Sequence, residues 1–420
     1  MRLILTGDLH LGRSSSRIPD TVGKENLRAG SAWNRIVDLA IKQDADIVCL
    51  SGDIADQTNK FWEAIGPLKF GIQRLTEYGI RTVAVAGNHD FDVLPELADQ
   101  LPSDHFTLLG REGRWERTTI ELKNGEALNI DGWSFPSAKV SVSPLNSYDL
   151  ESDPHVPTLG MVHGDLFKSN SPYAPLQLNR LQSSGPTGWL LGHIHAPELI
   201  SGESWVLYPG SPQAFDPGER GPHGPWVVDL KNGSFSLPVQ HPISTVRYLQ
   251  SSIDLSSVND RSELHSTILQ KILAEEEDIH LKADPFLVHT SLRLKLHGHT
   301  SVSRFVNETA RQLVADLDLP SITVDKIVNL TLPAISLEEY AGTDSAAGAV
   351  AKLLLQLENN DISEPVSELI RSTTEKLSRQ NRSENYGVSV AQEASDEMTI
   401  EYLISSGKAL LTQLVSQTNE

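Results

Sequence analysis

Residues of the kinds that bind metal ions recur in five short motifs in the first half of the sequence. They are Asp8 and His10 in Gly-Asp-Leu-His, Asp53 in Ser-Gly-Asp, Asn88 and His89 in Gly-Asn-His-Asp, His163 in His-Gly, and His193 and His195 in Gly-His-Ile-His. Imidazole, carboxylate and amide ligands without a thiolate suit Mn, Fe or Zn, and mixed sites of this kind are common in two-metal hydrolysis. Two ions ~3.5–4 Å apart can hold a phosphodiester, activate a water molecule and stabilise the leaving oxygen. Such a pair needs a bridging carboxylate, and Asp53 stands alone at its motif in the right chemical form.

Each motif follows a short apolar run that would position it. The runs are Leu3–Thr6, Ile47–Leu50, Thr82–Ala86, Leu159–Val162 and Trp189–Leu191. Continuous apolar runs of this length predict strands buried on both faces, with helices such as 31–42 and 61–78 between them. The pattern indicates a layered α/β domain with its ligands at the strand ends. Glycines beside the ligands allow sharp turns and a close backbone approach to the ions; they are Gly7, Gly52, Gly87, Gly164 and Gly192.

One such motif alone means little, but all five occur in order. This order resembles the calcineurin-like metallophosphoesterase superfamily, whose signature is D-x-H, G-D, G-N-H-D/E, H and G-H-x-H. The resemblance implies a two-sheet α/β sandwich flanked by helices. It implies one metal held by Asp8, His10, Asp53 and His195, and a second held by Asp53, Asn88, His163 and His193. It also implies that His89 contacts the phosphate and helps to protonate the leaving oxygen, with Asp90 as its orienting partner.

Further segments resemble one family within it, the SbcD-like DNA repair exonucleases. They are Asp8–Gly12, Gly52–Asp56 and Tyr208–Gln213, while 171–175, 219–224 and 292–305 resemble its YhaO-like branch. This resemblance implies a Mn-dependent DNA nuclease with 3′ to 5′ exonuclease and endonuclease activity. It implies an SbcC-type, SMC-like coiled-coil ATPase as partner, bound by C-terminal helices. Asp56 and Ser211, which lie in these motifs, are expected to contact the substrate.

Two features near the motifs allow either a DNA contact or a structural role. Tyr173 would stack on a base or pack within its proline-flanked loop. The basic residues between Arg13 and Arg35 would contact DNA phosphates or belong to a solvated loop. A small-molecule phosphodiesterase and a non-catalytic scaffold of the ATPase are the alternative functions, because the metal site does not choose the substrate.

The pattern changes after about residue 241. Strict alternation from Phe286 to Leu296 predicts a half-exposed strand, with helices at 264–273 and 302–317 and a further strand at 324–332. Together they predict a small α+β capping domain at 242–335, after the nuclease domain at 1–241. The remainder, 336–420, carries three apolar helical stripes. The polar linker 378–395 makes one compact core of the three difficult to form, which favours a partner-binding tail.

Composition limits the remaining choices. The 420 residues include 35 Lys+Arg and 55 Asp+Glu, a formal net charge of −20. This charge argues against indiscriminate nucleic-acid binding, although metal ions can invert the charge of a carboxylate cluster. The single cysteine, Cys49, lies in an apolar run and excludes a disulfide scaffold. No apolar run is long enough for a signal peptide or a membrane span, so we expect a cytoplasmic protein that contacts no membrane. The oligomeric state is open, with a homodimer as one option.

Overall fold

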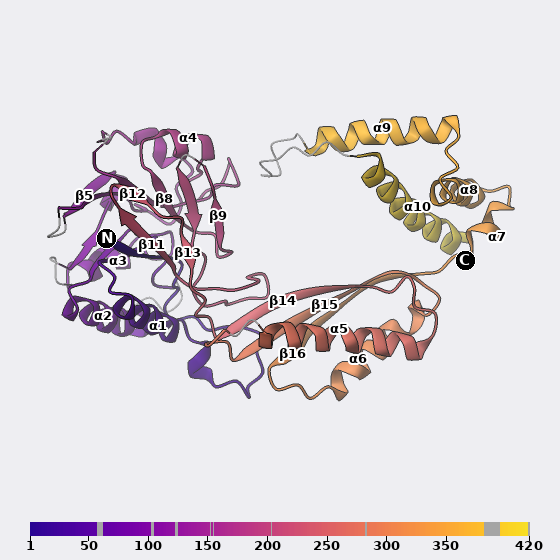
Figure 1. The fold of residues 1–420 in the computed structure, drawn as a ribbon, viewed down its shortest axis with the longest axis horizontal. Helices are drawn as coiled ribbons and strands as arrows, with labels where there is room; N and C mark the ends of the chain where they lie inside the picture. The colour runs from indigo at the N-terminus through magenta and orange to yellow at the C-terminus, as the bar shows by residue number, and fades with distance from the viewer. Residues whose placement is uncertain are drawn as a thin grey trace. The chain divides into compact units, whose positions relative to one another are not determined.

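The computed structural model describes residues 1–56, 62–101, 105–121, 125–151, 153, 155–202, 204–281, 284–381 and 395–418 (Figure 1). The first sheet has the order β12-β11-β1-β2-β3-β4, with β13 paired to β11. Its strands are β1 (Arg2–Thr6), β2 (Ile47–Leu50), β3 (Arg81–Ala84), β4 (Phe106–Leu108), β11 (Trp226–Lys231), β12 (Ser234–Phe235) and β13 (Val239–Gln240). From β1 to β4 neighbouring strands are parallel. Their carboxyl ends therefore meet at one edge.

The second sheet has the order β5-β6-β7-β8-β10-β9. Its strands are β5 (Glu116–Glu121), β6 (Ala127–Trp133), β7 (Thr158–His163), β8 (Gly188–Gly192), β9 (Glu198–Ile200) and β10 (Trp205–Tyr208). The four central strands, β6, β7, β8 and β10, pair in parallel with one another, and the edge strands β5 and β9 pair antiparallel to them. The five strands predicted to precede the motifs are confirmed as β1, β2, β3, β7 and β8, with boundaries that differ by at most two residues.

The two sheets pack face to face through one apolar core. Leu5 and Cys49 of the first sheet and Met161 and Leu190 of the second belong to it. The alternate residues of the first sheet, such as Ile4, pack beneath α1 (Ala29–Lys42) and α2 (Trp62–Glu77). These strands are therefore buried on both faces, as predicted, and Cys49 is a buried thiol whose pKa burial raises.

Shorter elements complete this part of the chain. They are η1 (Lys24–Leu27), α3 (Val93–Ala98), η2 (Arg111–Gly113), η3 (Pro144–Ser147) and α4 (Leu178–Ser183). On the outer face of the second sheet, Leu181 of α4 packs with Trp189, Val206 and Tyr208. The result is a two-sheet α/β sandwich flanked by helices, the predicted fold class.

A third sheet, β14-β15-β16, follows the sandwich. It consists of β14 (Val246–Asp254), β15 (His289–Thr300) and β16 (Ile322–Pro333), with α5 (Arg261–Leu281) and α6 (Ser303–Asp316). Leu292, Leu294 and Leu296 are buried on one face, as the alternation predicts. The predicted start of this strand is wrong: Phe286 and Val288 are exposed and precede the strand, because a turn closes between Leu287 N–H and the Asp284 carbonyl.

The C-terminal part contains α7 (Leu337–Ala341), α8 (Ala346–Glu358), α9 (Glu364–Asn381) and α10 (Asp396–Thr418). Their apolar stripes pack on one another. Leu354 of α8 meets Leu411 of α10 in one cluster, and Leu357, Val366 and Ile370 form a second with residues of α10. The expectation that the three stripes do not share a core is therefore wrong. Most of the predicted linker, 382–394, lies outside the described residues.

The chain forms two compact units. One comprises Met1–Ser251, Ala274–Arg293 and Asp318–Lys326, and the other Ser252–Leu273, Leu294–Leu317 and Ile327–Glu420. The three-domain boundaries stay a prediction, because these units divide the third sheet and α5 along their lengths. Among the helices of the described ranges, none is long and apolar enough to cross a membrane.

Candidate metal centre

The strand ends bring the predicted ligands together at the edge where β1, β2, β3, β7 and β8 finish. Three groups of side chains each place one ligand atom per residue within 4.8 Å of the others. The groups are Asp8, His10 and His195; His10, Asp56 and His89; and Asp8, Asp53 and His163. Most of these residues are buried. Carboxylates and imidazoles that converge in a buried position are stable only when paired or when they bind a cation.

The backbone at this edge is strained. Asp8, His10 and Asp53 have φ angles of 49°, 45° and 49°, and His193 has a φ of 100°. Positive φ at a residue with a side chain costs on the order of 1–3 kcal/mol and is frequent at functional sites. The strain is held by backbone hydrogen bonds between the loops, since Asp8 N–H donates to Gly52 O and His10 N–H to Asp53 O.

Two of the histidines face each other through their Nε2 atoms. His10 Nε2 lies 3.0 Å from His195 Nε2. The opposite nitrogen of each ring is next to a carboxylate: His10 Nδ1 lies 3.2 Å from Asp56 Oδ1, and His195 Nδ1 lies 2.7 Å from Glu219 Oε1. If each Nδ1 carries the proton that its carboxylate accepts, the two Nε2 lone pairs point at one another. This donor set fits a bound cation.

A second convergence surrounds His163. Its Nδ1–H donates to Ser51 O at 3.0 Å, so its Nε2 faces Asn88 Oδ1 at 3.1 Å and Asp53 Oδ2 at 3.4 Å. Burial lowers the pKa of His163, but the charge and hydrogen bond of Asp53 outweigh it and raise this pKa to about 9. Without metal, the ring therefore holds a proton where a cation would bind.

Asp53 lies between the two convergences. Its Oδ2 is 3.4 Å from His163 Nε2 and 3.8 Å from His10 Nε2, and its Oδ1 accepts from His89 N–H at 2.9 Å. Burial favours the neutral acid, but His163 and His10 hold the pKa of Asp53 well below its usual range. The bridging role stays a prediction, and this position supports it.

His193 contacts the site through its backbone N–H group and lies close to it with its ring. Its N–H donates to both oxygens of Asp8, at 3.0 and 3.2 Å. The ring lies 5.4 Å from the His163 ring, between centroids, and burial with the charge of His163 lowers its pKa to about 4. A neutral imidazole is the form that binds metal. The structure places His193 beside the second convergence but in none of the three groups.

Two glycines show why the backbone needs no side chain here. A Cβ on Gly192 would lie 2.1 Å from Ser51 O and 2.5 Å from His163 Nδ1, and one on Gly87 would lie 2.2 Å from Asp53 Oδ1. Neither has a positive φ. Close approach, rather than a sharp turn, therefore requires glycine at both positions.

The structure corrects the expected partner of His89. The Asp90 carboxylate is fully buried and accepts from the backbone N–H groups of Gly87, Ile54 and Ala55 at 2.7, 2.6 and 3.3 Å. It joins the second and third motif loops and is not placed on the His89 ring. Two other carboxylates lie beside that ring: Asp56 Oδ1 is 3.9 Å from His89 Nδ1, and Asp53 Oδ2 is 4.0 Å from His89 Nε2. The ring is about one-third exposed, so it can reach a substrate.

The three expected substrate residues have different surroundings. Ser211 is fully buried and its hydroxyl donates to Glu219 Oε2 at 3.0 Å, so its expected substrate contact is not available. Asp56 is buried against His10. Tyr173 is half-buried with its ring centroid 5.0 Å from that of His193, and base stacking there stays a prediction.

Glu219 is the residue of this site that sequence reasoning missed. Besides His195, it accepts from Phe215 N–H at 2.6 Å and from Ser211. Burial raises the pKa of this carboxyl, but the hydrogen bond and charge of His195 bring it below its usual value. No spacing rule links residues 195 and 219. The available signal is an acidic residue in the Gly- and Pro-rich stretch that follows the motif Tyr208–Gln213.

Comparison with known proteins finds one family whose sequence pattern matches the part of the chain that contains this site. Residues 1–197 match the family described as calcineurin-like phosphoesterase, and this part of the chain is similar to that family. That description names a phosphoesterase, and the three convergent groups of side chains are of a kind that could hold metal ions.

Among sequences, the chain is 27% identical over 275 residues to the uncharacterized metallophosphoesterase YhaO of Bacillus subtilis, which covers 64% of this chain and 66% of that protein. It is 23% identical over 242 residues to the DNA double-strand break repair protein Mre11 of Methanosarcina mazei, covering 56% and 37%. Mre11 of Halobacterium salinarum is 25% identical over 235 residues, covering 55% and 57%. The matches span less than two thirds of each relative.

Similar solved structures include TT1561 of Thermus thermophilus, at 14% identity and a TM-score of 0.35, covering 57% of this chain and 98% of that one. A 5′-nucleotidase described as putative, from Staphylococcus aureus, has 12% identity and a TM-score of 0.38, covering 58% and 54%. Likeness at this level adds nothing to what the sheets and the site already define.

Proposed function

We propose that this protein is a Mn-dependent DNA nuclease that hydrolyses phosphodiester bonds at the strand-end site. The observation that carries the proposal is the double convergence of buried ligands on either side of Asp53. Asp8, His10, Asp53 and His195 would hold one ion, and Asp53, Asn88, His163 and His193 the other. Two bound divalent ions would bind the phosphate and lower the pKa of a water molecule bound to them.

The protein's own side chains prepare this chemistry. Asp56 and Glu219 fix the proton of His10 and His195 on Nδ1, which leaves each Nε2 free for a metal. His163 is fixed in the same way by the Ser51 carbonyl. His89, whose ring is partly exposed and next to Asp53, is placed to contact the phosphate and to give a proton to the leaving oxygen.

DNA as the substrate is supported by the relatives. Two of them are described as DNA double-strand break repair proteins. The sequence motifs that resemble the SbcD-like exonucleases add 3′ to 5′ exonuclease and endonuclease activity to the proposal. An SMC-like ATPase is the partner that the same resemblance implies. Because the tail helices bury their stripes on one another, such a partner would have to use their outer faces.

The test compares two classes of substrate, DNA and a small phosphodiester, with the same protein preparation. End-labelled duplex and single-stranded DNA and a small aryl phosphodiester are incubated with Mn²⁺ and the wild-type chain. Asp53→Asn is the inactive reference, and Asp38→Asn, an exposed carboxylate on α1, is the matched control. Cleavage of DNA that is lost only in Asp53→Asn supports the nuclease. Turnover of the aryl ester without any DNA cleavage would instead favour a small-molecule phosphodiesterase.

A further inference from the structure

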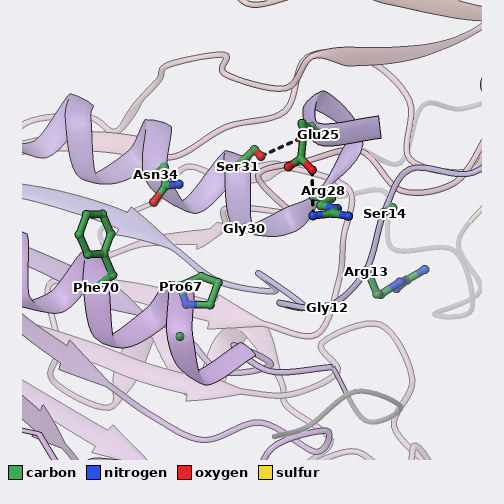
Figure 2. A pocket seen from close by; sticks show the side chains of 11 residues that line it. Gly12, Arg13, Ser14, Glu25, Arg28, Gly30, Ser31, Asn34, Pro67 and Phe70 are labelled. Carbon is green, nitrogen blue, oxygen red and sulfur yellow. Dashed lines mark hydrogen bonds and ion pairs between the residues drawn. The ribbon is translucent and has the colours of Figure 1, made fainter. Parts of the chain in front are cut away.

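A cavity of about 580 Å³ lies between the first turn of α1 and the first half of α2. Figure 2 shows its lining. Phe70 and Asn34 lie at one end, Arg13 and Arg28 at the other, and Gly30 and Pro67 between them. This volume is within the range of ligand sites in proteins. None of the metal-centre residues lines the cavity, so it is distinct from that centre.

The arginine end is close to the metal centre. Arg13 N–H donates to the His10 carbonyl at 2.9 Å. Its guanidinium lies 4.7 Å from the centroid of the Phe215 ring, and that ring lies 6.1 Å from the His10 ring, between centroids. One aromatic side chain therefore separates the guanidinium of Arg13, a residue of the cavity lining, from a proposed metal ligand.

The same end is suited to a phosphate. Arg13 is paired with Asp216 at 2.9 Å, and Arg28 with Glu25 at 3.0 Å. The second pair is mostly in solvent, with 58% of the Arg28 side chain and 78% of the Glu25 side chain exposed. An exposed pair of this kind is weak, so Arg28 can exchange its carboxylate for a phosphate. In a chain with a net charge of −20, two guanidinium groups on one cavity are a local exception.

The opposite end is suited to a base. Phe70 is 57% exposed, although it is a large apolar side chain. An exposed aromatic face stacks on any base, and the nearby amide of Asn34 can both donate to and accept from a base edge. Between the two ends, Gly30 has no side chain that could fill the cavity, and a Cβ built on it would lie 3.6 Å from Pro67 Cγ.

We propose that the α1–α2 cavity binds a nucleotide unit of a single DNA strand that extends from the metal centre. Its phosphate lies at Arg13 and Arg28, and its base stacks on Phe70. This inference rests on the proposed nuclease function and adds to it a place where the substrate strand is held beyond the reacting phosphate. The cavity would then favour a polymer over a small phosphate ester.

The experiment measures the binding of a fluorescein-labelled oligothymidylate to the full chain in EDTA, so that no cleavage occurs. Phe70→Ala should weaken binding about 5- to 100-fold, the range of one lost base–aromatic stack, and leave the salt dependence unchanged. Arg28→Ala should lower the slope of log K against log[salt] by about 0.7, the value of one single-strand phosphate contact. Tyr78→Ala, an exposed aromatic that follows α2, and Arg81→Ala, an exposed arginine that begins β3, are the matched controls and should bind like wild type.

The outcomes separate this inference from the proposed function. Wild-type affinity in Phe70→Ala, or an unchanged salt slope in Arg28→Ala, overturns the cavity as the nucleotide site, even if the wild-type chain cuts DNA. A wild-type chain that hydrolyses the aryl ester but neither binds nor cuts DNA overturns the nuclease function itself. Circular dichroism of each variant shows whether the fold is intact, which the exposure of Phe70 and Arg28 leads us to expect.

Discussion

Glu219 offers the sharpest test of how the metal centre is held. Its carboxylate serves three donors: Oε1 accepts from His195 Nδ1 at 2.7 Å, while Oε2 accepts from Phe215 N–H at 2.6 Å and Ser211 Oγ at 3.0 Å. A glutamine has only one acceptor oxygen. If this oxygen stays on Phe215, the amide NH₂ faces His195 Nδ1 and favours the ring form with its proton on Nε2. That proton occupies the position that a metal needs.

Glu219→Gln should therefore weaken the binding of one of the two proposed metal ions, the one held by His195. Loss of a carboxylate that orients a ligand histidine costs about 10- to 100-fold in metal affinity. Because the amide stabilises the ring form of His195 that has no free Nε2 lone pair for a metal, we expect the upper end, about 100-fold or about 2.8 kcal/mol. The ion near His163 should be retained, since its ring is held by Ser51 and not by Glu219.

The assay is a titration of EDTA-treated protein with Mn²⁺. Calorimetry and the electron paramagnetic resonance signal of Mn²⁺ measure the binding during this titration. Glu198→Gln, an exposed glutamate on β9, is the matched control and should bind like wild type. A melting curve without metal checks that the variant is folded. Two ions of wild-type affinity in Glu219→Gln, or equal weakening of both, would refute the reasoning.

Four further results are expected. Asp53→Asn should lose both ions, whereas His89→Ala should keep both and lose turnover; equal metal loss in purified samples of the two would make His89 a ligand. Exhaustive chelation should abolish hydrolysis and Mn²⁺ should restore it best, so full activity in the chelated protein would contradict the two-metal site. Below pH 9, metal affinity should increase about tenfold for each unit by which the pH is raised, because metal binding must displace the proton that the raised pKa of His163 retains. An affinity that does not depend on pH would show that no such proton is released. Removal of residues 338–420 should leave metal content and aryl ester hydrolysis nearly unchanged, because the tail helices bury their apolar residues chiefly on one another. It should abolish co-purification with the proposed SMC-like ATPase, and an insoluble or inactive truncated chain would assign the tail to the catalytic core.

The sequence by itself determined the strands and the ligands that end them. A parallel strand buried on both faces needs an unbroken apolar run, and a polar residue at its carboxyl end is conspicuous against that run. Ile47–Leu50 is such a run, and it ends three residues before Asp53. Since parallel strands finish at the same edge, local patterns were enough to predict that Asp53, His163 and their fellow ligands converge.

The tertiary structure alone decided which groups hold these ligands. Glu219 reaches His195 through a loop of irregular backbone, Asp90 turns to the backbone of Ile54 instead of His89, and Ser211 is buried. Likewise, only the packing of α8, α9 and α10 shows that their stripes cover one another. Hydrophobic periodicity predicts that one face of a helix is buried, and residue type predicts that a buried polar group has a hydrogen-bond partner. Neither property identifies the partner, because a contact between residues distant in sequence depends on how the loops and helices are placed in space.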